Sequence, residues 1–138
     1  MKVITVIKGV ISAVLTTLVY LIGGWDIAMQ CLLIMIVLDY LTGMGKSYVS
    51  GTLNSNRGLK GIVKKLGLLV LVAVSQVVDV LLNMSGVVRT FIIYYIVANE
   101  GLSILENLGK MGIIVPKFLV EKLEQLKEGE MNELSDEN

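Results

Sequence analysis

Three acidic residues of this chain, Asp39, Asp79 and Glu100, lie inside stretches that are otherwise strongly apolar. A charged side chain is costly in a bilayer, where such acids commonly line ion or proton paths or join one helix to another. A soluble domain would place its acids on a wet surface. These carboxylates are therefore the first candidates for function, and their chemistry depends on the elements that hold them.

The composition places the chain among membrane proteins. Its 138 residues are 54% hydrophobic and 17% charged, with a mean hydropathy of +0.76, whereas soluble domains are about 25% charged. A soluble helical bundle would need a polar face on every helix, and the first two apolar stretches have almost none. We therefore expect an all-α integral membrane protein.

Four segments approach the length of about 20 residues that a transmembrane helix needs. They cover residues 5–23, 27–45, 66–83 and 87–105. The first two and the last two are joined by short turns, which predicts two antiparallel hairpins. Residues 1–107 then form the four-span domain, and residues 108–138 form a separate carboxyl-terminal region.

The charges predict the orientation of the spans. Residues 46–65 are expected to form a loop that contains basic residues and no acid. By the positive-inside rule this loop lies in the cytoplasm, and the basic residues near both termini place them on the same side. The residues that carry this topology signal are Lys46, Arg57, Lys60, Lys64 and Lys65.

The carboxyl-terminal region changes character after Pro116, the only proline. Charged residues there alternate with Phe118, Leu119, Leu123 and Leu126, which predicts a cytoplasmic amphipathic helix on the membrane surface or against a partner. The residues that follow Gly129 are rich in acids and form a predicted acidic tail.

Polar residues form stripes inside the spans. In the third span they recur at spacings of three and four, so they share one helical face that we expect to meet water or another subunit. A pair with Arg89 is the alternative explanation for Asp79, and no cation is apparent for Glu100. The candidates for a pore lining or an oligomer interface are Asp39, Ser75, Gln76, Asp79, Asn83, Asn99, Glu100 and Ser103.

Several kinds of site are not indicated by the residues. The chain has no histidine and one cysteine, Cys31, so the usual ligands of zinc and haem are missing and we expect no metal or cofactor. No nucleophile with a base and no phosphate-binding loop stands out, so an enzyme is not expected. The basic segment is too short and too poor in aromatic residues to indicate nucleic-acid binding.

Three strings resemble a known family: residues 38–43 (LDYLTG), residues 58–65 (GLKGIVKK) and residues 99–107 (NEGLSILEN). They are similar to strings in the phage lysis and toxin-secretion holins of Gram-positive bacteria and their phages, and the similarity runs from about residue 25 to residue 127. The signature positions of the resemblance are Asp39, Tyr40, Thr42, Gly43, Asn99, Glu100 and Gly101.

The resemblance implies a multi-pass protein of the host bacterial cytoplasmic membrane with both termini in the cytoplasm. It would form homo-oligomers that open lesions, releasing an endolysin or a toxin as cargo without binding it, and an antiholin would be a partner. A small ion channel or transporter is one alternative, with Asp39 and Glu100 lining its path. An antiholin or membrane scaffold that makes no holes is the other.

Overall fold

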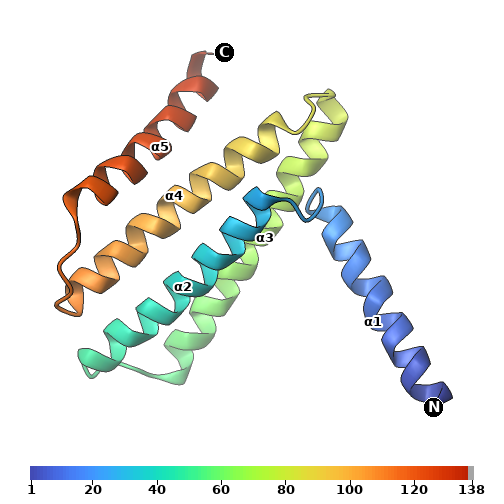
Figure 1. Ribbon diagram of the computed structural model, residues 1–138, viewed down its shortest axis with the longest axis horizontal. Helices are drawn as coiled ribbons and strands as arrows, with labels where there is room; N and C mark the ends of the chain where they lie inside the picture. Colours follow the sequence, from blue (N-terminus) through green and yellow to red (C-terminus); the bar gives the residue numbers. More distant parts are fainter. Residues whose placement is uncertain (137–138) are drawn as a thin grey trace.

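The computed structural model describes the backbone of residues 1–136 and the side chains of residues 1–129. The described chain folds into helices joined by short links (Figure 1). They are α1 (Lys2–Leu21), α2 (Ile27–Val49), α3 (Ser55–Leu82), α4 (Val87–Lys110) and α5 (Lys117–Asp136). The first four are long and apolar enough to cross a membrane, which confirms the predicted all-α membrane protein.

Polar and glycine residues between the helices set where each helix begins and ends. The Asp26 carboxylate accepts a hydrogen bond from the Met29 amide at 2.9 Å and caps α2. The Asn54 side chain caps α3 in the same way, accepting from the Arg57 amide at 2.8 Å. Between α3 and α4, Asn83 and Gly86 adopt positive φ angles of 52° and 87°, which allows the chain to reverse tightly.

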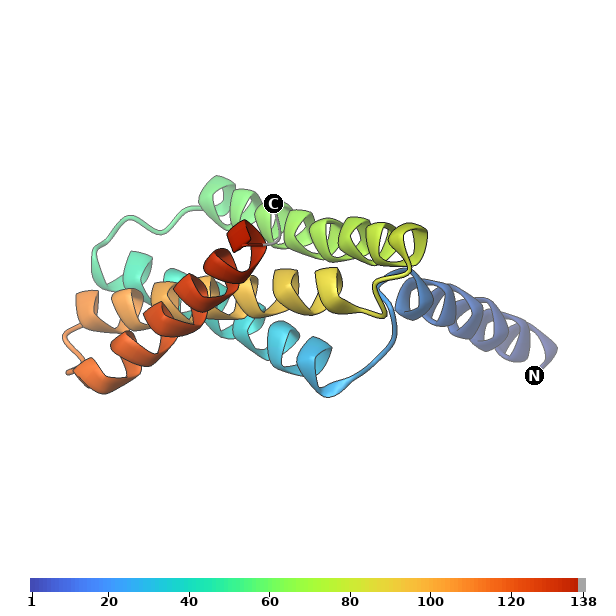
Figure 2. The ribbon, with the colours of Figure 1, turned by 90° about the horizontal axis from the view of Figure 1, so that it is seen from above.

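Helix α4 is the centre of the packing. It lies beside α2 and α3 on one side and beside α5 on another (Figures 1 and 2). Its contact with each of these helices is more extensive than the contact between α2 and α3. The core between α2, α3 and α4 is built around Met29, Leu32, Val72 and Ile93, which are fully buried. This three-helix core fixes the positions of the polar side chains within it.

Helix α1 differs from the predicted first hairpin, because it diverges from α2 instead of packing along it (Figure 1). None of its residues is buried. Gly23 and Gly24, with φ angles of 82° and 104°, direct the chain away after α1 ends. Helix α1 is mostly apolar and can be solvated by lipid, and the hydroxyls of Thr5 and Thr17 donate to carbonyls four residues earlier in the chain, so these polar groups do not draw α1 into the bundle.

The predicted loop 46–65 also differs, because most of it is helical. Lys46 lies in the last turn of α2, and α3 begins at Ser55, so only residues 50–54 link the two helices. The Asn54 cap starts a helix that no proline interrupts. We call the end of the bundle where α2 ends, α3 begins and α4 ends the basic end, defined by Lys46, Arg57, Lys60, Lys64 and Lys110.

Helix α5 occupies most of the predicted carboxyl-terminal region. It follows the turn after α4 and runs back along that helix in the opposite direction (Figure 1). The expected acidic tail continues α5 as far as Asp136, and Glu137 and Asn138 lie outside the described residues.

The close approach of α2 and α3 gives a test of this packing. A Cβ atom added at Gly61 would lie 3.2 Å from Tyr40 Cε2, whereas a Cβ atom at Gly67 would meet nothing within 4 Å. We expect Gly61→Leu to lower the free energy of unfolding by about 1–3 kcal/mol, because the larger side chain forces α2 and α3 apart. Unfolding in mixed detergent micelles, followed by circular dichroism, measures this change.

Gly67→Leu is the matched control on the same helix. It should leave stability unchanged or raise it slightly, because leucine has the higher helix propensity. Equal destabilisation by both variants would contradict the α2–α3 contact.

Candidate functional site

One lysine joins two of the predicted carboxylates inside the helical core. Lys65 of α3 donates hydrogen bonds from its ammonium group to Asp39 Oδ2 of α2, at 2.5 Å, and to Glu100 Oε2 of α4. The side chains of Lys65, Asp39 and Glu100 are only 17%, 13% and 6% exposed. The three core helices are therefore tied together by one shared cation.

Two neutral side chains complete this group. The Asn107 amide donates to Asp39 Oδ1 at 3.3 Å and to Thr42 Oγ1 at 3.2 Å. The Thr42 hydroxyl donates to the Leu38 carbonyl at 2.8 Å. Both oxygens of Asp39 thus have a donor, as a carboxylate removed from water requires. We call Asp39, Thr42, Lys65, Glu100 and Asn107 the Lys65 cluster.

The Lys65 cluster holds two acids against one cation. With all three groups ionised it carries a net charge of −1, and the attraction of Lys65 for both acids is strong because little water screens it. Separating one helix from the other two would leave a charge without its partner, which is strongly unfavourable in an apolar environment. The cluster can therefore act as a lock between α2, α3 and α4.

The expectation that Glu100 lacks a cation is wrong. The charge pattern predicts a loop that includes Lys65, but this residue lies on α3 and its side chain reaches into the core. The seven-residue spacing from Glu100 to Asn107 places both on one helical face, and this spacing could have indicated Asn107 from the sequence. No local sequence pattern of this kind indicates that Lys65 pairs with Asp39 and Glu100.

Asp79 contacts the backbone at Val88 and Arg89 and not the Arg89 side chain, which is the alternative explanation for this acid. Its carboxylate accepts hydrogen bonds from the backbone amides of Val88, at 3.0 Å, and of Arg89, at 2.6 Å. These amides belong to the first turn of α4, where a negative charge is favoured by the helix dipole. Asp79 therefore fastens the end of α3 to the start of α4.

The Arg89 guanidinium instead ties α4 to the link between α1 and α2. It donates to Asp26 Oδ2 at 2.7 Å and to the Ile22 carbonyl at 2.5 Å. The hydrogen bond from Arg89 holds the pKa of the Asp26 carboxyl below its ordinary value. Sequence reasoning did not identify Asp26 as this partner, although both residues border the short turns at the same end of the spans.

The remaining members of the third-span stripe lie near Arg89. Gln76 and Asn83 line an open, mainly polar cavity of about 610 Å³ together with Asp79 and Arg89. Ser75 is buried and donates to the Val72 carbonyl at 2.7 Å. The stripe thus gathers at the end of the bundle opposite the Lys65 cluster.

The other two candidates lie on α4, away from both groups. Asn99 is exposed and accepts a hydrogen bond from Lys127 of α5 at 3.2 Å, and Ser103 is half-buried. The structure therefore separates the eight predicted positions into three places rather than one continuous lining.

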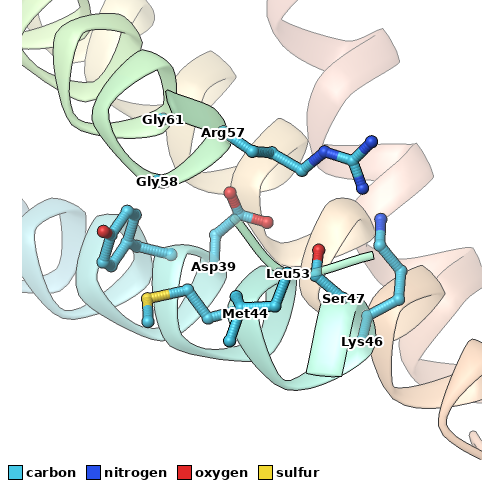
Figure 3. Close-up of a pocket in the computed structure, with 10 residues that line it drawn as sticks. Asp39, Met44, Lys46, Ser47, Leu53, Arg57, Gly58 and Gly61 are labelled. Atoms are coloured by element: carbon cyan, nitrogen blue, oxygen red, sulfur yellow. The ribbon is translucent and has the colours of Figure 1, made fainter. Parts of the chain in front are cut away.

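A second cavity, of about 330 Å³, lies between α2 and α3 at the basic end (Figure 3). The signature residues Tyr40 and Gly43 line it, and Asp39 points from α2 toward α3, while Lys46 and Arg57 extend beside it. Among the described residues, no group of three or more acids, histidines or cysteines could hold a metal ion. The polar residues of the Lys65 cluster and of this cavity are suited to holding helices together and to contacting water or lipid headgroups.

Removal of Lys65 tests the lock. We expect Lys65→Met to lower the free energy of unfolding by about 3–5 kcal/mol, because it leaves Asp39 and Glu100 buried without their cation. Lys64→Met is the matched control, since Lys64 is exposed and adjacent in sequence. Unfolding of both variants in detergent micelles measures the difference, and an equally small effect of the two would exclude a structural role for the cluster.

Acidification tests the contact between Asp26 and Arg89. A lowered pKa means that the contact stabilises the fold above pH 3.8, the ordinary value of Asp26, and is lost as the pH falls through the lower folded value. Asp26→Asn should cost about 0.5–1 kcal/mol at pH 7, a small value because the side chain is half exposed. It should also reduce the loss of stability on acidification, measured by unfolding in detergent at several pH values.

Glu121→Gln is the control for this acid effect, since Glu121 is exposed on α5 and makes none of these contacts. An unchanged pH dependence in Asp26→Asn would contradict the ion pair.

Comparison with known proteins shows the family to which the chain belongs. The bacteriophage holin family matches residues 16–128. An uncharacterised protein of Clostridium perfringens strain 13 is 45% identical over 112 residues, which cover 80% of this chain and 83% of the relative. A second uncharacterised protein of Clostridium perfringens, of 14.9 kDa, is 43% identical over 91% of this chain and 96% of its own length.

One similar protein carries a functional description. A probable holin of Bacillus phage phi105 is 30% identical over 95 residues, which cover 69% of this chain and 70% of the phage protein. No solved structure matches the fold. The family match covers the three core helices and the Lys65 cluster, and this multi-pass membrane protein belongs to the bacteriophage holin family.

Proposed function

We propose that this holin-family protein assembles in the bacterial cytoplasmic membrane and opens lesions through which an endolysin or a toxin leaves the cell. The family membership supports a holin-type role, and the Lys65 cluster is the observation that supports a switch. Its charges are paired inside one subunit, where the packed helices shield most of their surface. Any rearrangement of α2, α3 and α4 must give these charges new partners or water.

This requirement suggests how a lesion could open abruptly. A closed subunit satisfies Lys65, Asp39 and Glu100 internally, and an open assembly satisfies them with water or with a neighbouring subunit. Both arrangements are better than exposure to lipid, so a modest difference in free energy separates them. Intermediate arrangements expose charge to lipid and are sparsely populated, which favours a delayed and cooperative opening.

Homo-oligomerisation follows from the size of the cargo. Helices pack about 8–10 Å apart, so the four spans of one chain cannot surround a hole wide enough for a folded protein. Several copies must share the wall of such a hole. The exposed apolar surfaces of α1 and α3 offer the lateral contacts that lipid occupies in a single copy.

The orientation that we propose follows the positive charges. The basic end lies in the cytoplasm, together with the amino terminus and the turn that leads from α4 into α5, while the Arg89 end faces outward. Lys2 and Lys8 at the start of α1 agree with this orientation.

Controlled expression tests the function. Induction should collapse the membrane potential and, at the same time, release a co-expressed cytosolic cell-wall hydrolase. Glu100→Gln should change the time of collapse by about twofold or more, because it removes one charge from the Lys65 cluster. Glu106→Gln, on the exposed side of the same helix, should change it less. A potential-sensitive dye and release of the hydrolase are followed together.

Two outcomes would replace this proposal. Leakage of ions or a small dye without release of folded protein would indicate a channel. Membrane insertion without any leakage, together with protection of cells that express a lethal holin, would indicate an antiholin or scaffold.

A further inference from the structure

Helix α5 packs closely along α4, although its sequence is too polar for it to lie in lipid. Leu123 of α5 covers Gly101 of α4, and a Cβ atom added at Gly101 would lie 2.9 Å from Leu123 Cδ1. The missing side chain at this signature position thus makes room for α5.

A charged contact lies farther along the same pair of helices. The Lys127 ammonium group donates to Asn99 Oδ1 at 3.2 Å and lies 5.7 Å from the centre of the Tyr95 ring. Lys127 is thereby fixed on α4 by an amide and by the negative face of an aromatic ring.

The depth of this contact conflicts with a position at the membrane surface. Asn99 precedes the end of α4, at Lys110, by 11 residues (110 − 99), which corresponds to about 16 Å along the helix. The hydrocarbon core is about 30 Å thick. With α4 spanning the membrane, Lys127 lies near the middle of the core.

The two sides of the molecule suit different solvents. The first turn of α5 exposes Phe118 and Leu119, but from Glu121 on its outward side is charged and polar, with exposed Glu121, Lys122, Glu124, Gln125 and Glu128. The exposed side of α3 is apolar from Leu66 onward, with Leu66, Val70, Val74, Val77 and Leu81. Lipid can cover the surface of α3, whereas α5 at the same depth requires water.

We propose that α5 lines the water-filled lumen of the assembled hole, with its charged side facing the water and with α4, α2 and α3 between it and the lipid. This inference rests on the proposed function, because only an assembled hole brings water to this depth. It assigns the lumen side to α5 and to the α4 face beneath it, which carries Tyr95, Asn99 and Gly101. The polar residues near Lys65 and Asp79 then face other helices, of the same subunit or of a neighbouring subunit.

A reversible crosslink between α4 and α5 tests the proposal. In a Cys31→Ser background, Gly101→Cys and Leu123→Cys place two thiols where the Leu123 side chain covers Gly101, and shortening Leu123 to cysteine leaves room for a disulfide between α4 and α5. The full-length protein is assembled in liposomes that contain a small dye and a folded fluorescent protein. We expect the disulfide to form in the assembled protein, and protein release to stay within about twofold of that in the reduced sample.

Two results would overturn the proposal. Loss of protein release on oxidation, with recovery on reduction, would show that α5 must leave α4 for the hole to open. Failure of the disulfide to form in assembled, releasing protein would show that α5 lies elsewhere.

A second measurement reports on α5 independently of release. A fluorophore on Glu124→Cys should be quenched by iodide in water and little by nitroxides at the bilayer centre, and one on Val74→Cys should show the reverse. Quenching of the Glu124→Cys fluorophore by the nitroxides would overturn the position of α5. Wild-type protein that releases neither dye nor protein would contradict the proposed function, while the quenching result would still locate α5.

Discussion

The fold depends on a single lysine that bridges two carboxylates from neighbouring helices. Lys65 links Asp39 of α2 to Glu100 of α4, so the three core spans share one charged centre in addition to their apolar contacts. In lipid, apolar side chains lose little on separation, because the hydrocarbon chains replace their contacts. A buried ion pair behaves differently, since no part of the hydrocarbon core can replace it. Because lipid can replace the apolar contacts but not the ion pairs, the Lys65 cluster determines which helices pack together.

The opposite end of the bundle uses the same principle with different partners. Asp79 holds the first amides of α4, and Arg89 holds Asp26 and a carbonyl from the end of α1. Charged contacts thus fix both ends of the α2–α3–α4 core, while α1 stays outside it and α5 is added along α4. A membrane protein built in this way can change its lateral contacts without unfolding its core, which suits a protein of the holin family.

The sequence predicted those features that depend on local pattern. The four spans follow from apolar runs of sufficient length, and the amphipathic helix follows from the alternation after Pro116. The partner of Glu100 could not be predicted, because Lys65 is 35 residues away and basic residues near a span also suit a loop. The divergence of α1 from α2 could not be predicted either, because a mostly apolar helix can lie in lipid or pack against a neighbour. The docking of α5 depends on a missing side chain at Gly101, which a single sequence cannot interpret.

The most direct measurement is the coupling free energy between Lys65 and Glu100 in a bilayer. It is obtained from a double-mutant cycle of wild type, Lys65→Met, Glu100→Gln and the double variant, each unfolded reversibly in the same lipid. A charged centre that holds the three helices together predicts a coupling of about 2 kcal/mol or more, with the double variant more stable than Lys65→Met alone. Additive effects, with a coupling near zero, would contradict it.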